Sequence, residues 1–224
     1  MIPVLDDAAA LGQLLADVRA AFGASLCDVE RIVVDGGSRD ASVDVARANG
    51  AGTLVADRGR ARQLIAGIAA ARSDWIWMLH ADSRIDASAA DALQRVIADR
   101  EPAWGRFDIG LSGRHPLLRV VEALMNARSR ITGIATGDQG VFAHRALLER
   151  IGGVPDQPLM EDIELSKRLR RIARPRCLAA QIETSSRRWE ARGIVRTVAL
   201  MWRLRAMYAF GASPERLERI YYRG

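Results

Sequence analysis

The segment Ile32-Val33-Val34-Asp35-Gly36-Gly37-Ser38 decides the fold prediction. It begins with three consecutive β-branched residues, and such continuous rather than alternating apolarity is typical of a strand covered on both faces. The run stops at an acidic residue and a glycine-rich turn. Strands of this kind occur in parallel sheets that helices cover, so the segment predicts an α/β fold.

Similar units surround this segment. Three further short apolar runs alternate with segments whose apolar residues have helical spacing. The predicted strands span residues 2–5, 32–34, 53–56 and 75–79, and the predicted helices span 8–22, 40–49 and 60–71. Repeated strand–helix units predict a mostly parallel central sheet with flanking helices.

Each of the four predicted strands ends at an acidic residue. These residues are Asp6 with Asp7, Asp35, Asp57 and, two residues farther on, Asp82. Ligands bind at the carboxyl edge of open α/β sheets. Carboxylates that converge there would repel one another without a cation, so the pattern predicts a bound divalent metal ion.

The turn after residue 35 is not a known phosphate-binding loop. Gly36-Gly37-Ser38 follows a strand, but it has neither the G-x-x-x-x-G-K-S/T nor the G-x-G-x-x-G spacing. This excludes a P-loop NTPase and a Rossmann-type dinucleotide site. We expect the glycines to let a flat base approach the backbone beside Asp35.

Composition limits the class of protein further. The 224 residues are 49% hydrophobic and 27% charged, which suits one globular domain with a sizeable core. The net charge is +6, and Lys167 is the only lysine among 33 basic residues. Arginine suits phosphates and carboxylates, although GC-rich codon usage explains the excess equally well. Only 5% of the residues are aromatic and no nucleic-acid-binding motif is present, so we expect no nucleic-acid partner.

The sequence also predicts a location. Two cysteines give no disulfide framework, which favours a reducing compartment. We find no secretory leader and no run of about 18 apolar residues. We therefore expect a cytoplasmic protein that does not cross a membrane.

Several short motifs follow one another along the chain. They are Ile2-Pro3-Val4-Leu5-Asp6-Asp7, Val34 to Asp40, Gly59-Arg60-Ala61-Arg62-Gln63, Leu79-His80-Ala81-Asp82-Ser83, Gly137-Asp138-Gln139-Gly140 and Met160-Glu161-Asp162. In this order they resemble motifs of family 2 glycosyltransferases, the first four being written I-P-x-x-N-E, V-D-D-G-S-x-D, G-R-A-x-Q and L-H-A-D-T. Each motif alone is weak, but their order and spacing agree from residue 2 to about 222.

The resemblance implies a GT-A-like fold and an activity. Residues 1–224 would form one domain, with a nucleotide-sugar half at about 1–104, an acceptor half at about 105–185 and basic amphipathic helices at about 186–224. The implied reaction transfers a sugar from a nucleotide-diphosphate sugar to an acceptor hydroxyl, with inversion at the anomeric carbon. The implied cofactor is Mn²⁺ or Mg²⁺ on the diphosphate.

The resemblance also implies roles for individual residues. Asp162 would be the catalytic base, and Asp82 would ligate the metal. The nucleotide sugar would be bound by Pro3, Asp35, Gly36, Arg60, Arg62, His80 and Asp82. Asp138, Gln139 and Glu161 would lie on the acceptor side.

Three departures from the family pattern leave alternatives open. Gly36 stands where relatives have a second acid, His80 replaces the first acid of the usual D-x-D, and Ile65 stands where relatives generally have Asn. As an imidazole, His80 could join a Mn²⁺ shell, bind the ribose or simply pack at the end of its strand. Asp138 could equally serve only to form its turn.

The predicted base has a structural alternative as well. The positive end of a helix dipole favours an ionised carboxylate, which suits Asp162 as a base. Acidic residues are common in first turns, however, and the same dipole favours Glu161 and Glu164. The sequence alone does not rank the three.

The C-terminal region is basic and apolar. From Arg187 onward arginines alternate with Trp, Tyr and aliphatic residues, and segment 115–131 has a similar mixture. This composition is typical of an interfacial helix on anionic lipid. The alternatives are packing on the domain and an oligomer contact. A lipid-linked acceptor would place the protein at the inner face of the membrane.

Two other functions compete with sugar transfer. A catalytically inactive nucleotide-binding relative would keep the fold and lose the metal site, as His80 suggests. A sugar-nucleotide pyrophosphorylase would share the α/β half. It would, however, need a glycine-rich, lysine-containing loop that residues 2–10 do not provide.

Overall fold

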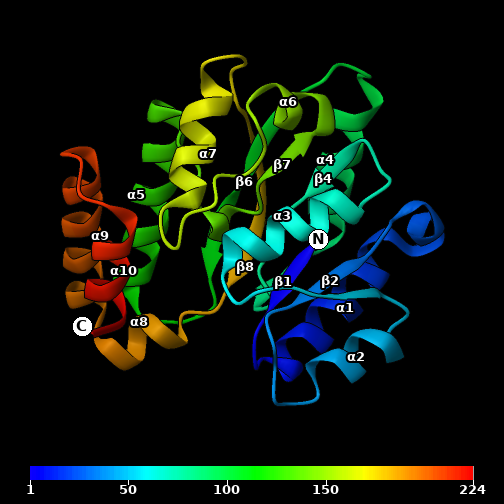
Figure 1. Ribbon diagram of the computed structural model, residues 1–224, viewed down its shortest axis with the longest axis horizontal. Helices are drawn as coiled ribbons and strands as arrows, with labels where there is room; N and C mark the ends of the chain where they lie inside the picture. Colours follow the sequence, from blue (N-terminus) through cyan, green and yellow to red (C-terminus); the bar gives the residue numbers. More distant parts are fainter. Residues whose placement is uncertain (224) are drawn as a thin grey trace.

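The computed structural model describes residues 1–223, and its N-terminal half is built on a parallel sheet (Figure 1). The strands β1 (Ile2–Val4), β2 (Ile32–Asp35) and β3 (Gly52–Val55) pair in parallel in that order. Every residue of β2 is buried, as its continuous apolar run predicts. The α/β fold class is thus confirmed at the segment from which it was predicted.

Helices connect and cover these strands. They are α1 (Ala8–Phe22), α2 (Ser42–Ala48) and α3 (Arg60–Ala70), with a short 3₁₀ helix η1 (Gly23–Asp28) after α1. The buried stripe of α1 consists of Leu11, Leu14, Leu15 and Val18. This spacing is the one that predicted the helix.

A second sheet forms the middle of the molecule, with the strand order β4-β7-β6-β8-β5. Its strands are β4 (Trp75–Trp77), β5 (Ser83–Arg84), β6 (Trp104–Leu111), β7 (Phe142–His144) and β8 (Arg176–Thr184). Strands β6 and β8 run parallel, whereas β4–β7, β6–β7 and β5–β8 are antiparallel. The second half therefore mixes both directions.

Met1 joins the two sheets. Its amino group donates to the Trp77 carbonyl at 2.7 Å, and its carbonyl accepts from the Leu79 amide at 3.0 Å. The carboxyl ends of β1, β2 and β4 consequently meet at one edge. Of the predicted nucleotide-sugar residues, Asp35, Gly36, His80 and Asp82 come at or just after the ends of β2 and β4.

The remaining helices of the second half cover its sheet. They are α4 (Ala87–Ala98), α5 (Pro116–Thr132), α6 (Arg145–Arg150) and α7 (Glu161–Arg170), with a 3₁₀ turn η2 (Gly137–Gln139). Trp104 and Phe107 of β6 are fully buried at the centre of this half.

The C-terminal helices α8 (Arg187–Arg192), α9 (Ile194–Ala209) and α10 (Pro214–Arg223) lie on the side of the molecule formed by α5 and α7 (Figure 1). Leu204 and Leu217 are fully buried against Met160 and Ile163, so α9 and α10 pack on the start of α7. Within residues 1–223, none of the helices is both long enough and apolar enough to span a membrane.

Candidate active site

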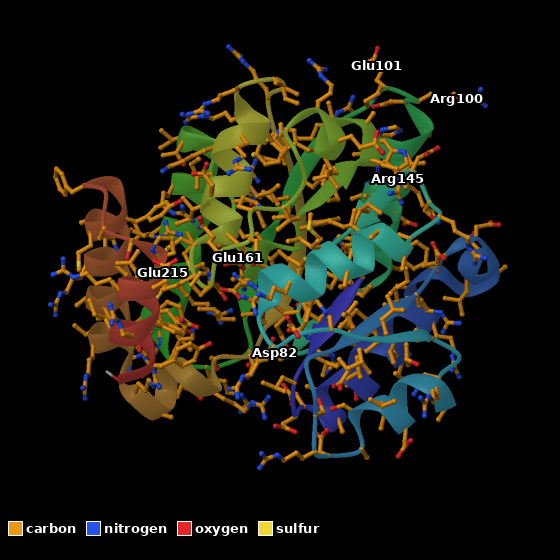
Figure 2. All side chains as sticks on the ribbon, viewed as in Figure 1. Asp82, Arg100, Glu101, Arg145, Glu161 and Glu215 are labelled. Atoms are coloured by element: carbon orange, nitrogen blue, oxygen red, sulfur yellow. The ribbon has the colours of Figure 1, made fainter. Side chains whose placement is uncertain are left out.

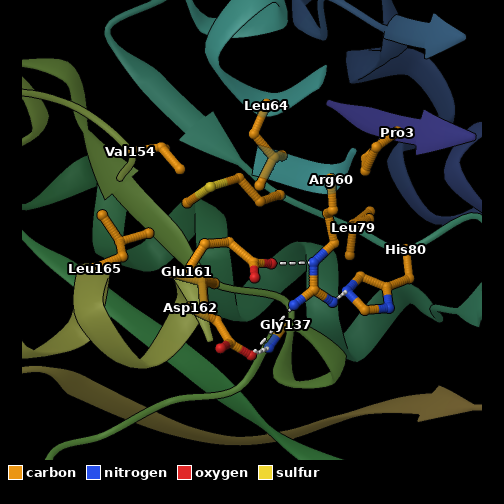
Figure 3. Close-up of a pocket in the computed structure, with 12 residues that line it drawn as sticks. Pro3, Arg60, Leu64, Leu79, His80, Gly137, Val154, Glu161, Asp162 and Leu165 are labelled. Atoms are coloured by element: carbon orange, nitrogen blue, oxygen red, sulfur yellow. Dashed lines mark hydrogen bonds and ion pairs between the residues drawn. The ribbon is translucent and has the colours of Figure 1, made fainter. Parts of the chain in front are cut away.

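Arg60, the first residue of α3, lies at the centre of a polar cluster (Figure 3). Its Nε is ion-paired with Glu161 Oε1, and its Nη2 lies 3.4 Å from Asp162 Oδ2. Its Nη1 lies 2.7 Å from His80 Nε2. Arg60 and His80 belong to the first half of the chain and the two acids to the second. The cluster therefore joins the two halves.

The contacts of His80 define its protonation pattern. Arg60 can only donate, so Nε2 of the imidazole must accept. The ring proton is then assigned to Nδ1, which lies 3.2 Å from Asp138 Oδ1 and donates to it. Both ring nitrogens are occupied, which leaves no lone pair for a metal ion. His80 thus orients Arg60 in this structure.

Asp162 is held by the start of α7. The residue before the helix, Met160, has the left-handed conformation (φ 66°, ψ 18°), which is strained for a residue other than glycine. Asp162 Oδ2 accepts from the Gly137 amide at 2.8 Å, and Oδ1 accepts from the Ile163 amide at 2.7 Å. Two backbone amides thereby fix the carboxylate in the pocket.

The structure ranks the three acids of this helical turn, which the sequence did not. The Glu161 side chain is only 3% exposed and is committed to Arg60, whereas that of Asp162 is 15% exposed. Glu164 pairs with Arg168 and accepts from the Tyr208 hydroxyl. Of the three acids, only Asp162 both lines the pocket and has a side chain that is partly exposed to solvent.

The charges of the cluster depend on one another. Burial lowers the pKa of Arg60, but the negative charges of Glu161 and Asp162 more than offset this effect and raise its pKa overall. Burial raises the pKa of Glu161, and the Arg60 charge offsets this only in part. Arg60 is therefore a permanent cation, and Glu161 is a weaker acid than usual.

A pocket opens beside this cluster. It is lined by Pro3, Arg60, Leu64, Met78, Leu79, His80, Gly137, Val141, Val154, Glu161, Asp162 and Leu165. In Figure 2, Glu161 lies near the middle of the molecule, whereas Arg100 and Glu101 lie at its edge. A Cβ at Gly137 would collide with His80 Nε2 and lie 2.7 Å from Arg60 Nη1, so only glycine allows this close approach.

Asp35 is turned toward its own backbone. Its carboxylate accepts from the amides of Gly37 and Ser38 at 3.0 Å. Gly36 donates to the Val4 carbonyl, and a Cβ there would lie 3.2 Å from Gln63 Nε2. Gln63 belongs to the G-R-A-x-Q motif, but no role was predicted for it from the sequence. Its buried side-chain amide donates to the carbonyls of Val4 and Val34 and so ties α3 to β1 and β2.

Three of the four strand-end carboxylates have other surroundings in the structure. Asp6 accepts from the Arg39 amide, Asp35 holds its turn, and Asp57 is 83% exposed beside Arg62. Across residues 1–223 we find no group of three or more His, Cys, Asp or Glu side chains that could hold a metal ion. Asp6 and Asp35 thus accept hydrogen bonds from backbone amides, and Asp57 lies in solvent.

Asp82 differs from these three. It lies two residues after His80, and with the described residues it makes no hydrogen bond or ion pair. Burial raises the pKa of the nearby Asp7; the charge of Arg187 opposes this shift, while the charges of Asp82 and Asp40 add to it. Asp82 thus offers carboxylate oxygens beside other acids, the setting that a cation would stabilise.

Of the predicted site residues, Pro3, Arg60, His80, Glu161 and Asp162 line the pocket, whereas Asp35, Gly36, Arg62, Asp82, Asp138 and Gln139 do not. Arg62 is half exposed and pairs with Asp57 at 3.6 Å and Asp156 at 3.5 Å. Gln139 is fully buried in a capping box with Thr136, and its amide donates to Ser129 Oγ at 3.0 Å. The remaining acceptor-side residues, Asp138 and Glu161, belong to the Arg60 cluster.

Solved structures resemble this fold at low sequence identity. TarS residues 1–349 from S. aureus are 17% identical with a TM-score of 0.65, and the match covers 83% of this chain and 59% of that one. The mannosyltransferase PcManGT from Pyrobaculum calidifontis, solved with GDP-Man and Mn²⁺, is 20% identical with a TM-score of 0.67, covering 99% and 66%. Glucosyl-3-phosphoglycerate synthase from Mycobacterium tuberculosis, solved with Mn²⁺, UDP and glucosyl-3-phosphoglycerate, is 17% identical with a TM-score of 0.57, covering 82% and 68%.

These likenesses establish the GT-A fold. The chain spans about three fifths of the length of the TarS segment that it matches. No curated protein sequence matches the chain. The sequence profile of glycosyl transferase family 2 matches residues 1–142, which is more than half of the chain, and the protein therefore belongs to that family.

Proposed function

We propose that the protein transfers a sugar from a nucleotide-diphosphate sugar to an acceptor hydroxyl, with inversion at the anomeric carbon. The observation that carries this proposal is the Arg60 cluster between the two halves. It places a permanent cation for a diphosphate next to Asp162, a partly exposed carboxylate that can take a proton. Family membership and the nucleotide-bound relatives support the same conclusion.

The reaction is a single displacement. The acceptor oxygen attacks the anomeric carbon from the face opposite the diphosphate, which inverts the configuration. The bond between that carbon and the diphosphate oxygen breaks, and the nucleoside diphosphate leaves with the electron pair. The acceptor proton passes to a carboxylate oxygen of Asp162.

Arg60 links donor binding to the base. Its contact with Asp162 is the longest of its three, at 3.4 Å. A diphosphate is a stronger partner for this nitrogen because charge-assisted hydrogen bonds to phosphate are short and strong. When the donor draws Nη2 away, Asp162 loses a cation and becomes a better proton acceptor. The base is thereby activated only when donor is present.

A divalent metal fits the oxygen donors at Asp82. Mg²⁺ and Mn²⁺ often take one or two protein carboxylates beside substrate phosphates, and Asp82 is a carboxylate without a protein partner among the described residues. His80 does not fit as a ligand because Arg60 and Asp138 occupy its nitrogens. When bound, the ion would neutralise charge on the leaving diphosphate.

The remaining residues that we assign to the nucleotide sugar lie on or just after β1 and β2. We assign base recognition to Asp35 with Gly36, and the ring of Pro3 to the wall of the donor pocket. We assign Asp138 and Glu161, which hold His80 and Arg60, to the acceptor side of the cluster. We also propose that the transferred sugar is a hexosyl group, since a mannosyltransferase of similar fold was solved with GDP-Man.

A nucleotide-binding relative without activity is the second candidate. The observation in its favour is His80, which occupies the place of a family acid and supplies no ligand. Such a protein would bind nucleotide without needing a metal.

We also propose that the acceptor is lipid-linked and that the protein works at the inner face of the membrane. Apolar side chains are exposed on α5 and α9, on the side of the molecule that carries the arginine-rich helices (Figure 1). They are Leu117, Val120, Leu124, Ile131, Val195 and Trp202. Mixed basic and apolar surfaces of this kind bind anionic lipid.

Thermal shifts with nucleoside diphosphates test the proposal, because a ligand that binds only the folded state raises the melting temperature. We expect at least one nucleoside diphosphate to stabilise the protein more with Mn²⁺ or Mg²⁺ than with EDTA. Asp82→Ala should remove the metal-dependent part of the shift. Asp57→Ala is the matched control, since this strand-end aspartate lies in solvent and should leave the shift intact. Equal shifts with metal and with EDTA in the unchanged protein would favour the inactive relative.

A further inference from the structure

Four polar side chains are buried around the turn at residues 135–140, which contains η2 and precedes β7. They are Ser129 on α5, Thr136 and Gln139 in the turn itself, and Ser166 on α7. Their exposed fractions are 1%, 8%, 0% and 0%. Buried polar groups are generally hydrogen-bonded, and a satisfied network of them makes its surroundings rigid. The contacts of these side chains therefore show which part of the chain they hold in place.

Ser166 connects α7 to the beginning of the 135–140 turn. Its hydroxyl accepts from the Ala135 amide at 3.1 Å and donates to the Ala135 carbonyl at 3.4 Å. Ser166 comes four residues after Asp162, which is about one turn farther along α7. The chain is thus fixed to α7 at a point one helical turn from the proposed base and two residues before Gly137.

Gln139 holds the same turn from the side of α5. Its side-chain oxygen accepts from the Thr136 amide at 3.2 Å, and its side-chain nitrogen donates to Ser129 Oγ at 3.0 Å. The side chain is fully buried, so both hydrogen bonds are made away from water. Ser166 and Gln139 therefore fix the turn from two different helices, at residues on either side of Gly137.

Gly137, between these two fixed points, contacts the proposed base. Its amide donates to Asp162 Oδ2 at 2.8 Å, while Oδ1 of the same carboxylate accepts from the Ile163 amide within α7. The Gly137 amide thus holds the carboxylate from outside its own helix. The orientation of the Asp162 side chain consequently depends on where the 135–140 turn places this amide.

We propose that Ser166 and Gln139 are positioning residues for the proposed sugar transfer. They hold the Gly137 amide at the point where it orients the Asp162 carboxylate. This inference rests on the proposed function, because it assumes that Asp162 takes the proton of the acceptor. Both side chains are fully buried, so they act through the turn and not on the substrates. A general base must lie within hydrogen-bond reach of the proton, and a small displacement lowers turnover strongly.

The donor side of the cluster depends less on this turn. Glu161 pairs with Arg60 directly, and the hydrogen bonds that the two positioning residues make with other described residues include neither of them. The turn reaches Arg60 indirectly, through the contact of Asp138 with His80. Loosening the turn should therefore displace the base more than the diphosphate-binding cation. A general structural defect would instead affect both.

Turnover and donor binding in Ser166→Ala test the proposal. We expect release of nucleoside diphosphate from a panel of nucleotide sugars to fall about 10- to 100-fold. The thermal shift given by nucleoside diphosphate with Mg²⁺ should stay the same. Gln139→Met, which acts from the side of α5, should give the same pattern. Ser186→Ala is the matched control: this serine is 2% exposed and its hydroxyl contacts Ser112, so neither quantity should change.

A double substitution shows whether the positioning residues act through the base. In an Asp162→Asn protein, Ser166→Ala should cost no further turnover, within about twofold, because the carboxylate that it would misplace is gone. A structural defect would instead multiply with the loss that Asp162→Asn causes. Independent effects in the double variant, or unchanged turnover in Ser166→Ala alone, would overturn the inference. The Ser166→Ala result decides where Gln139→Met does not fold.

Hydrogen exchange separates this inference from the proposed function, since it needs no activity. The Gly137 amide should exchange slowly in the unchanged protein and in Ser186→Ala, and faster in Ser166→Ala and Gln139→Met. If exchange changes in this way but the unchanged protein releases no nucleoside diphosphate, the proposed function is wrong and the hold of the turn on Asp162 stands. If the unchanged protein turns over and Gly137 exchanges equally in all variants, only the positioning is wrong.

Discussion

At the scale of single residues, the pair Arg60–Glu161 links the two halves without having to stabilise the fold. Its carboxylate is almost fully buried, and burial raises the pKa of Glu161 in spite of Arg60. A buried ion pair of this kind is weak grounds for assuming stability. The Arg60–Glu161 pair instead holds the Arg60 guanidinium beside Asp162.

We predict that Glu161→Gln makes the protein more stable at pH 7 to 8. The folded-state pKa of Glu161 lies above its ordinary value of 4.5, so ionisation removes stability as the pH rises through the folded pKa. The neutral amide avoids this loss, and its advantage should fade as the pH falls toward 4.5, where Glu161 is protonated. Urea unfolding at several pH values measures the difference.

Glu164→Gln is the matched control for this change. Glu164 lies in the same helical turn, but its pair with Arg168 is more exposed, and exposed pairs contribute about 0–1 kcal/mol. It should show no gain in stability at neutral pH. A Glu161→Gln protein that is less stable than the control at pH 7 to 8 would show that the buried pair stabilises the fold.

The resemblance predicted Arg60, His80 and Asp162 as site residues and implied roles for them, but it did not predict their mutual contacts. Their contacts span about 100 residues of chain, as between Arg60 and Glu161, and local patterns carry no information about such approaches. The same limitation explains why the buried position of the Gln139 side chain was not predicted. Its motif placed it on the acceptor side, whereas its side chain holds the turn from within.

At the scale of elements, prediction succeeded where the pattern was strong. Continuous β-branched residues predicted β2, and 3.6-residue spacing predicted α1 and α3. The long strands of the second sheet were not predicted. In β8 most residues are only partly buried or exposed, so the run lacks the uniform apolarity of a covered strand. Antiparallel pairing of β7 also has no local signature.

The exposed face of α9 gives an element-scale prediction about lipid. Val195 and Trp202 lie seven residues apart, hence on one face, and are 70% and 66% exposed. We expect the protein to sediment with phosphatidylglycerol vesicles but not with neutral vesicles. Trp202→Ser should weaken this association about tenfold, the scale of burying one large apolar side chain.

Val55→Ser serves as the control for lipid binding, because Val55 is also well exposed but lies on β3 in the other half. It should sediment as the unchanged protein does. If the unchanged protein stays in solution with anionic vesicles, the apolar face of α9 does not bind lipid.

At the scale of the whole molecule, the site exists only because three parts of the chain meet. The first half supplies Arg60, the second supplies Asp162, and the C-terminal helices α9 and α10 pack on Met160 and Ile163 at the start of α7. The division into these parts was predicted from motifs. Their contact was not, since the packing of α9 on α7 depends on the folded arrangement of both.

The most direct test of the account measures binding and turnover separately in Asp162→Asn. The amide keeps the shape of the first turn of α7 and removes the basicity. Donor binding is followed by thermal shift, and turnover by release of nucleoside diphosphate from a panel of nucleotide sugars. We predict nearly unchanged binding and a fall in release of about 10²–10⁴-fold, while Glu164→Gln retains both. Unchanged release, or an equal loss of stability, binding and release, would contradict the assignment of Asp162 as the base.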